Sequence, residues 1–334
     1  MVKDSTVEYL TGGNAEAAEG IDGEGVQRFR INRRVVHTPT LIPSLATRRV
    51  IKVSSGHAHV VALTDTHEML SSGYNDRGQL GHGTRMNSSA FRPVRGLDGV
   101  IIVDVACGQQ HNIAISALSG HPAAATAAVG AAAADFPPGS VFTWGSGALG
   151  ALGQGATVGD CLEPTLVSHE ELPPVKSVAS GANFCVALSE AGAVFSWGHS
   201  EYGQHGTRAH GEHDSRRQGS RRHGDARYYY VPRQNMSATL QGRNIQQVQC
   251  GSQFTIACDE EGDVITWGWN SFGVLGHGRG GAGMNPKVIE ALEGHHVMNV
   301  QAGDNVRREA GGEGIVSAHT TKPLPLTHNC AHTV

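Results

Sequence analysis

The chain has 334 residues, of which 45 are glycine, and its formal net charge at pH 7 is -4. This balance excludes a surface that attracts nucleic acid over its whole area. The sequence has no run of 18 apolar residues of the kind that crosses a bilayer, so we expect no membrane partner.

The first 37 residues form an acidic segment. Its early part holds Lys3 as the one cation, against Asp4, Glu8, Glu16, Glu19, Asp22 and Glu24. A secretory signal needs a basic start and an apolar block, and a DNA-binding arm needs a run of basic residues, so we expect neither. Tyr9–Gly13 and Pro39–Leu45 are candidates for the remains of one half-unit of the repeat that follows.

A short phrase then recurs along the chain. Its form is Val-x-x-Gly-x-x-(His or Phe)-x-x-Ala, and its copies begin at Val53, Val105, Val178 and Val248, with a partial copy at Val300. The glycines of the phrase are separated by 52, 73, 70 and 52 residues. Self-similarity at a long period indicates a repeat array, here with a unit of about 52 residues and two insertions.

A second phrase follows each full copy of the first. It is Ser72-Gly73 in the first unit and Trp-Gly in the others, at Trp144, Trp197 and Trp267. Two apolar runs across a turn that ends in glycine are typical of a β-hairpin. A glycine-rich stretch comes next, where we expect glycine to supply positive φ in tight turns. A proline then opens another apolar run, at Pro93, Pro164, Pro232 and Pro286.

The unit therefore predicts up to four short strands and no helix. Repeated radially, such units predict an all-β fold, a β-propeller of four-stranded blades with about five repeats visible. We expect the repeats over 38–305, with insertions near 117–138 and 207–231. Residues 306–334 lack periodicity and contain Gly-Gly, Lys-Pro and Leu-Pro breaks, so we expect a non-repeat, disordered tail.

The two phrases in this order, followed by the proline, resemble the repeats of the regulator of chromosome condensation family. The resemblance covers roughly 38–305 and implies a propeller, which in that family usually has seven blades; the five repeats visible here leave full closure open. The sequence lacks the Trp-Asp dipeptide of WD propellers. It also lacks the Gly-Trp-Arg-His-Thr segment of the family's plant ultraviolet-B photoreceptor, so we do not expect that function.

Histidine and cysteine, the usual metal ligands, follow the repeat. His59 and His111 occupy the slot that holds phenylalanine in other units, which predicts packing, and His82, His205 and His277 recur in the glycine-rich turn. The six cysteines include no Cys-x-x-Cys pair, and the slot of Cys107 and Cys250 holds serine or alanine elsewhere. We expect no metal, no cofactor and no disulfide, and a reducing compartment, cytoplasmic with nuclear as the alternative.

Catalytic signatures are missing as well. The sequence has neither a Gly-x-Ser-x-Gly elbow nor a phosphate-binding loop that ends in Gly-Lys-Ser/Thr. We therefore predict that this chain is not an enzyme.

Candidate partner-binding residues lie where the repeat copies differ. We expect the turns after the second phrase to present variable side chains on one face. The repeated tryptophans are expected to pack between blades, whereas Trp269 lies off the repeat and could anchor a partner. The candidates in these turns are Tyr74, Asp76, Arg77, His199, Glu201, Tyr202, Trp269 and Asn270.

The segment from Arg208 to Arg233 is the strongest charge feature. It holds seven arginines against three acidic residues and includes Tyr228-Tyr229-Tyr230. Its arginines could contact an acidic or phosphorylated partner, and it is the one place where nucleic-acid binding is plausible. The candidates here are Arg216, Arg217, Arg221 and Arg222.

These observations favour a non-enzymatic scaffold that binds protein partners through the loop-bearing face of a propeller. The family resemblance implies two alternatives. One is guanine-nucleotide exchange on a small GTPase of the Ran type, as the founding member performs. The other is a targeting module of a larger assembly, such as a HECT-type ubiquitin ligase.

Overall fold

The computed structural model describes residues 41–120, 136–207, 228–270, 273–278 and 283–303, together with the backbone of 316–320. The acidic segment 1–37, with its expected half-unit at Tyr9–Gly13, lies outside the described residues, and so does most of each predicted insertion.

Four antiparallel sheets, each built from four consecutive strands, make up the fold, and we call them blades 1 to 4. Blade 1 contains β1 (Val50–Ser55), β2 (His59–Thr64), β3 (Met69–Gly73) and β4 (Ser88–Pro93). Blade 2 contains β5 (Ile102–Cys107), β6 (His111–Ser116), β7 (Val141–Gly145) and β8 (Cys161–Leu166). Blade 3 contains β9 (Val175–Ser180), β10 (Phe184–Ser189), β11 (Val194–His199) and β12 (Tyr228–Gln234). Blade 4 contains β13 (Ile245–Cys250), β14 (Phe254–Asp259), β15 (Val264–Gly268) and β16 (Gly283–Val288).

A fifth unit follows as a two-stranded hairpin of β17 (Val297–Ala302) and β18 (Val316–Thr320). Three single-turn 3-10 helices, η1 (Pro43–Leu45), η2 (Ala148–Gly150) and η3 (Glu290–Leu292), lie in the connections. The predicted all-β propeller of four-stranded blades is confirmed.

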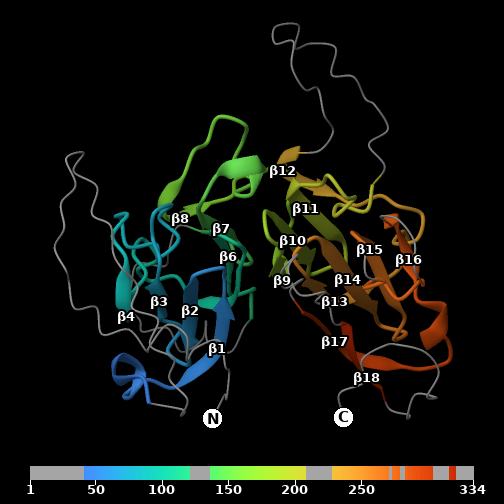
Figure 1. The fold of residues 1–334 in the computed structure, drawn as a ribbon, viewed down its shortest axis with the longest axis horizontal. Coiled ribbons are helices and arrows are strands. Elements are labelled where there is room, and N and C mark those ends of the chain that lie inside the picture. Colours follow the sequence, from blue (N-terminus) through green and yellow to red (C-terminus); the bar gives the residue numbers. More distant parts are fainter. Residues whose placement is uncertain are drawn as a thin grey trace, which may run out of the picture.

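The blades follow one another in chain order around a common axis (Figure 1). The first strands of neighbouring blades, β1, β5, β9, β13 and β17, contact one another in turn, so they line the inside of the arc. The fourth strands, β4, β8, β12 and β16, are the outer edges.

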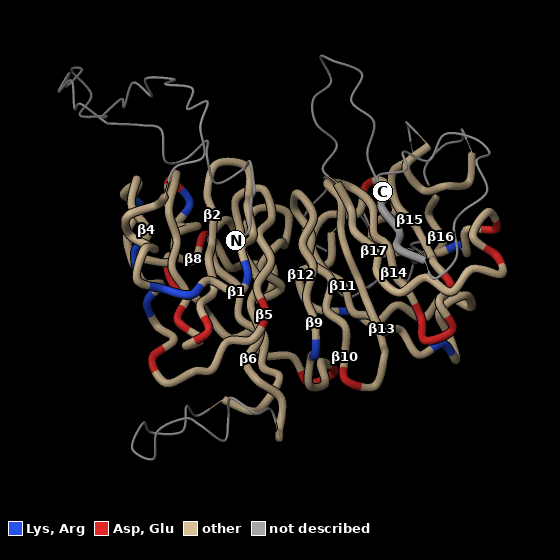
Figure 2. The backbone as a smooth tube through the Cα atoms, turned by 90° about the horizontal axis from the view of Figure 1, so that it is seen from below, with Lys and Arg blue, Asp and Glu red and all other residues tan. Residues whose placement is uncertain are grey.

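Each blade has two ends, which define two faces of the molecule. The turn between its first and second strands and the connection between its third and fourth strands emerge on one side, which we call the loop face. The turn between the second and third strands and the connection to the next blade emerge on the other, the turn face. The connection from β11 to β12 begins and ends at the loop face, and that from β6 to β7 at the turn face, which are the upper and lower edges of the molecule in Figure 2. The two predicted insertions therefore belong to opposite faces.

The core lies between the blades. Every residue of the second strands β2, β6, β10 and β14 is buried. One cluster joins Val61 and Leu63 of blade 1 to Val105, Phe142 and Trp144 of blade 2. A single blade could not bury both faces of its sheet alone, so each one depends on its neighbours for a core.

The repeated tryptophans fasten each blade to the one before it. Trp144, Trp197 and Trp267 are buried. Their indole Nε1 atoms donate to Gln79 O at 3.1 Å, Ala151 O at 3.0 Å and Gln204 O at 2.8 Å, all in the glycine-rich stretch of the preceding blade. The prediction that these tryptophans pack between blades is confirmed.

The glycine of the first phrase is required by close approach. An added Cβ would lie 2.2 Å from the His59 ring at Gly56, 2.1 Å from the His111 ring at Gly108 and 1.9 Å from the Phe184 ring at Gly181. The next residue then bonds to the following blade: His57 N donates to Gln109 O, Gln109 N to Ala182 O and Ala182 N to Ser252 O, at 2.9 to 3.1 Å. Because these glycines have no side chain, the ring three residues later can lie over their backbone, and the turn can approach the next blade closely enough to form this hydrogen bond.

A row of polar side chains on the inner strands was not predicted. It occupies the position four residues before each phrase glycine, where Lys52 pairs with Asp104 of the next blade. Asp104 Oδ2 accepts from Val178 N at 3.2 Å, and Gln247 Oε1 accepts from Val300 N at 2.9 Å. The signal in the sequence was a polar residue directly before the valine that opens each phrase.

Three boundaries differ from the sequence prediction. The prolines do not open the outer runs; they lie within or at the end of β4, β8, β12 and β16, where an outer edge tolerates a residue without an N–H. Tyr228–Tyr230 belong to β12, so the second insertion ends at 227.

The third difference is β18, because 306–334 was predicted to be a disordered tail outside the repeats. Within it, Val316–Thr320 pairs antiparallel with β17, and Ala318 lies opposite Val300 as Ala62 lies opposite Val53. Residues 304–315 displace this strand in sequence, which hides the repeat spacing. The other residues of the tail lie outside the described residues.

We expect Gly181→Ala to lower the free energy of unfolding by about 1–3 kcal/mol, because the new Cβ would overlap the Phe184 ring. The control is Gly159→Ala, where an added Cβ meets nothing within 4 Å and φ is not positive, so the change should stay within about 0.5 kcal/mol. Chemical denaturation of both variants checks this, and equal losses would contradict the close-approach account.

Candidate protein-binding face

The turns that carry the predicted candidates all lie on the loop face. Each begins at the glycine of the second phrase, Gly73, Gly145, Gly198 or Gly268, whose φ lies between +97° and +121°. This left-handed geometry, which favours glycine, turns the chain sharply out of the third strand. The residues that follow are therefore presented at the same end of every blade.

Asn270 is buried and braces its turn, contrary to the prediction that it meets a partner. Its Oδ1 accepts from Leu275 N at 3.0 Å, and its Nδ2 donates to Gly278 O at 3.2 Å. Asn75 in blade 1 makes equivalent hydrogen bonds: its Oδ1 accepts from Leu80 N at 2.8 Å and its Nδ2 donates to Thr84 O at 2.8 Å. An asparagine at this position is thus part of the repeat, and its polar atoms are already used.

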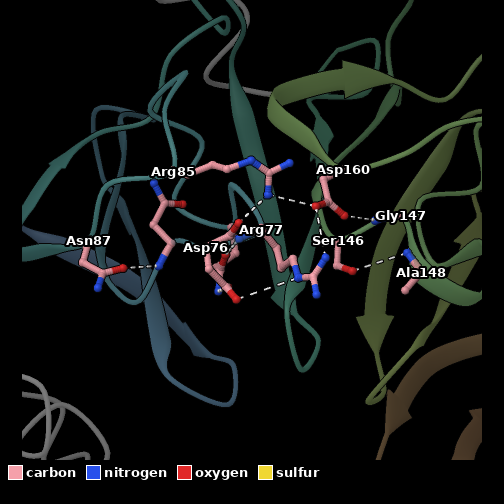
Figure 3. A network of polar contacts seen from close by, with 10 residues as sticks. Asp76, Arg77, Arg85, Asn87, Ser146, Gly147, Ala148 and Asp160 are labelled. Carbon is pink, nitrogen blue, oxygen red and sulfur yellow. Dashed lines mark hydrogen bonds and ion pairs between the residues drawn. The ribbon is translucent and has the colours of Figure 1, made fainter. Parts of the chain in front are cut away.

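Asp76 and Arg77 take part in an ion network between blades 1 and 2 (Figure 3). Asp160, in the connection of blade 2, lies 3.0 Å from Arg85 and 3.5 Å from Arg77, and its Oδ1 accepts from Gly147 N at 3.3 Å. Both arginines are about half exposed, at 50% and 51% of the side chain, so each ion pair is worth little by itself. The network holds the two loops in register and keeps guanidinium edges at the surface.

Tyr202 and Trp269 meet across blades 3 and 4, and His199 contacts the strand β12 of its own blade. The rings of Tyr202 and Trp269 lie 6.2 Å apart, and His199 stacks on Tyr228 at 5.5 Å. Glu201 lies 3.5 Å from His199. The predicted turn residues of blade 3 therefore contact both the turn of blade 4 and the strand β12.

These rings belong to a set of large side chains at the loop-face ends of blades 2 to 4, which we call the aromatic strip. At one end it extends to Tyr230, whose ring centroid lies 6.4 Å from that of Tyr228. Tyr230 packs against Gly150, which is next to Leu149 in blade 2. At the other end Met284 of blade 4 packs on Gly203, next to Tyr202. The members of the aromatic strip are Leu149, Tyr230, Tyr228, Tyr202, Trp269 and Met284.

Large exposed apolar side chains occur on the loop face of all four blades. They are Tyr74 and Met86 in blade 1, Leu149 in blade 2, Tyr230 in blade 3 and Met284 in blade 4. Leu149 has φ +59°, an uncommon backbone conformation for a leucine, and is 37% exposed. Leu41, Phe136 and Met236 are exposed in turn-face segments as well, whereas each of the four blades contributes such a residue to the loop face. Scattered single residues need no explanation, but apolar side chains gathered on one face are typical of a protein-binding surface.

The buried histidines have structural roles. His59 Nε2 hydrogen-bonds with Asn112 Oδ1 at 2.8 Å, and His111 Nε2 lies 3.0 Å from Ser180 Oγ. Burial lowers the pKa of His59 to about 4, and burial together with the nearby His59 lowers that of His111 to about 3. His205 occupies a slot that holds leucine in the other blades, where burial lowers its pKa to about 3. The packing prediction for His59 and His111 is confirmed, with the addition that both rings bond to the next blade.

No nucleophile is activated by this arrangement. His111, Ser180 and Cys185 lie within hydrogen-bonding range of one another, but burial raises the pKa of the Cys185 thiol to about 12. Cys107, in the small-residue slot, is likewise buried with its pKa raised to about 12. Among the described residues, Cys107, Cys161, Cys185, Cys250 and Cys258 are free thiols.

One acidic group could hold a cation by geometry alone. Asp259, Glu261 and Asp263 converge on the turn face, within 4.8 Å of one another. The Arg243 guanidinium already binds Asp259 and lies 2.8 Å from Asp263, so a positive charge is in place.

The predicted arginines of the second insertion, Arg216, Arg217, Arg221 and Arg222, lie outside the described residues. In the part of the chain that is described, no helix is long and apolar enough to span a membrane.

Comparison with known proteins agrees with this architecture. The family model for the RCC1-like domain matches residues 11–307. The chain belongs to the RCC1-like domain family. The human E3 ubiquitin-protein ligase HERC2 is 31% identical over 331 residues, which cover 88% of this chain and 6% of that protein. The Arabidopsis thaliana ultraviolet-B receptor UVR8 is 29% identical over 267 residues, which cover 80% of this chain and 52% of the receptor.

A solved structure shares the fold. Prp20p from Saccharomyces cerevisiae superposes with a TM-score of 0.65 at 18% identity, over 82% of this chain and 58% of Prp20p. The chain spans less than two thirds of the length of each of these relatives. The RCC1-like propeller is thus shared, and the activities of the longer proteins do not transfer with it.

The buried histidines predict a pH dependence of stability. The folded chain binds protons on His59, His111 and His205 near pH 3–4, whereas the ordinary pKa is 6.5, so the unfolded chain takes up more protons between these values. Stability should be full above pH 6.5 and fall toward pH 4, by about 1.4 kcal/mol per pH unit for each histidine.

In blades 3 and 4 the position of His111 holds phenylalanine. His111→Phe should therefore remove the contribution of one histidine, about 1.4 kcal/mol per pH unit, from the pH dependence of the free energy of unfolding. Urea denaturation of wild type and His111→Phe across pH 4.5 to 7 measures it, and identical slopes would contradict the role assigned to His111.

Proposed function

We propose that this chain is a non-enzymatic interaction module that binds protein partners through its loop face. The observation that carries the proposal is the row of exposed apolar side chains on that face, with at least one on each of the four blades. Such residues supply anchors at the centre of protein interfaces. The fold supports this because its repeats place variable turns side by side on a rigid arc.

The chemistry of the described residues supports a role without catalysis. The histidine, serine and cysteine that come together at His111, Ser180 and Cys185 are buried, and burial keeps both ring and thiol neutral. A nucleophile in this state lacks the lowered pKa that covalent catalysis needs. We also propose a reducing compartment, the cytoplasm or the nucleus, because the described cysteines are free.

Two narrower functions, nucleotide exchange on a small GTPase and targeting within a ubiquitin ligase, are supported only by similarity to relatives. The structure of Prp20p was reported with its binding to Gsp1p and histones, which supports a small GTPase as one class of partner. HERC2 is a ubiquitin ligase, which supports a targeting role for a propeller within a larger assembly. A nucleotide-release assay of this chain with a panel of small GTPases separates them, since faster release would support exchange and unchanged release would exclude it for those GTPases.

Photo-crosslinking tests the binding face. A photo-reactive residue in place of Leu149 or Tyr230 on the loop face should capture the same cellular protein, and one in place of Phe136 on the turn face should not. Leu149 and Phe136 are equally exposed, at 37%, so exposure alone cannot produce the difference. Capture from Phe136, or from neither loop-face position, would contradict the proposal.

A further inference from the structure

A groove of about 400 Å³ lies on the turn face, between blade 3 and the connection that leads to blade 4. Its two walls are the β10–β11 turn, at 190–193, and the connection 235–244 between β12 and β13. That connection has ten residues, whereas the connections at 94–101, 167–174 and 289–296 have eight each. The groove therefore coincides with the longest of these four connections, and its volume is within the roughly 300–1,000 Å³ of ligand-binding pockets.

The floor of the groove is apolar. Val194, Leu240 and Ile245 line it, and all three are buried members of the core between blades 3 and 4. Met236 also lines the groove and is 59% exposed. A methionine side chain is flexible and adapts to the shape of an incoming apolar group. A large aliphatic side chain placed here would extend an existing core.

The longer connection is held in place by hydrogen bonds to two neighbouring segments. Thr239 Oγ1 donates to Pro286 O at 2.9 Å, which fastens the connection to β16. Asn235 Nδ2 donates to His205 O at 2.8 Å, and Asn235 Oδ1 accepts from Ser237 N at 2.9 Å. The groove is thus formed before a ligand arrives, so binding does not have to order its wall.

Three carboxylates share one cation at one end of the groove. Arg243 lines the groove, and its guanidinium pairs with Asp259 and Asp263. Glu261 is the third carboxylate, and the three lie within 4.8 Å of one another. The guanidinium therefore leaves this group with an excess of negative charge.

Two further carboxylates lie beside residues that line the groove. Glu190 is exposed and directly precedes Ala191, and Lys176 is the cation that interacts with it. Glu260 is also exposed and accepts from Asn244 Nδ2 at 2.9 Å. Because that amide is neutral, it leaves the charge of Glu260 in place. Around the groove, the five carboxylates thus exceed the two cations.

The same sign of charge prevails over the described part of the turn face. Its connections, together with the segment 41–49 before β1, hold eleven acidic and four basic residues. The acidic ones are Asp65, Glu68, Asp98, Glu170, Glu171, Glu190, Glu260, Glu261, Asp263, Glu290 and Glu293, and the basic ones are Arg48, Arg49, Arg95 and Arg243. Figure 2 shows acidic segments along the lower edge of the molecule, which is this face. Arg233 of β12 extends toward Tyr229 instead, whose ring centroid lies 4.9 Å from its guanidinium carbon.

We propose that this groove binds a segment of a partner protein in which a large aliphatic side chain is flanked by lysine or arginine. The aliphatic side chain would lie on Val194, Leu240 and Met236, and the flanking cations would face Glu190 and Glu260. The same carboxylates repel nucleic acid and acidic segments, so the charge selects a basic one. This inference goes beyond the proposed function, because it places a second binding site on the opposite face of the molecule.

Fluorescence anisotropy with the full chain tests the proposal. The probes are a labelled peptide with a central leucine flanked on each side by lysines, the same peptide with serine for leucine, and the same peptide with glutamate for lysine. We expect the lysine–leucine peptide to bind at least about tenfold more tightly than either of the others, and more weakly at high salt. Equal binding of the serine peptide would remove the groove from the interaction and overturn the proposal, and so would equal or tighter binding of the glutamate peptide.

Variants at Met236 locate the site. Because this side chain is largely exposed, Met236→Lys and Met236→Glu should both fold. We expect the lysine variant to bind the lysine–leucine peptide about tenfold more weakly than wild type, and the glutamate variant to bind it more tightly. Met86→Lys is the control, since Met86 is exposed on the loop face of blade 1 and a charge there is screened from the groove by salt. Identical affinities for the two Met236 variants would contradict the assignment to the groove.

Failure of this inference is distinguishable from failure of the proposed function. Neither Leu149 nor Tyr230 lines the groove, and Phe136 belongs to the β6–β7 connection of blade 2. If crosslinks at Leu149 and Tyr230 capture a protein while the lysine–leucine peptide does not bind, only the groove is wrongly assigned. If the peptide binds in the groove and those crosslinks capture nothing, the groove is a binding site and the loop-face proposal fails.

Discussion

The fold depends on one hydrogen bond between neighbouring blades. In blades 1 to 3, the amide of the residue after the phrase glycine donates to the carbonyl oxygen of the equivalent residue in the next blade. It requires the turn to come close, which only glycine allows, because the ring of His59, His111, Phe184 or Phe254 folds over that position. The tryptophans add a second fastening further out, from each indole to the glycine-rich stretch before it. Since the core lies between blades, each blade is stable only when these contacts to its neighbours form.

This arrangement explains why alignment of the repeat copies separates structure from function. Where the copies agree, as at the phrase glycines and Trp144, Trp197 and Trp267, the residue holds two blades together. The sequence predicted this role correctly for the tryptophans. Where they differ, at Tyr74, His199 and Trp269, the side chain lies on the loop face. Asn270 is the exception, because its match to Asn75 marks it as a structural residue, and the sequence prediction overlooked that match.

Other features could not be predicted, for physical reasons. The polar row through Lys52, Asp104 and Gln247 is a relation between blades, and one strand's pattern does not reveal its partner across the arc. The same holds for Tyr202 with Trp269 and for Arg77 with Asp160, because these contacts join turns whose relative positions come from blade packing. The strand β18 was hidden because thirteen residues separate it from β17, where the other units need three.

Hydrogen exchange at the inner turns tests the account most directly. The amides of Gln109 and Ala182 lie in short turns at the loop face, where ordinary surface amides exchange rapidly. If the bonds between blades hold the arc together, these two amides should be protected as strongly as those of β6 and β10 and exchange only when the blades unfold together. Rapid exchange of Gln109 and Ala182 while β6 and β10 stay protected would show that the blades are held by side-chain packing alone and would contradict the account.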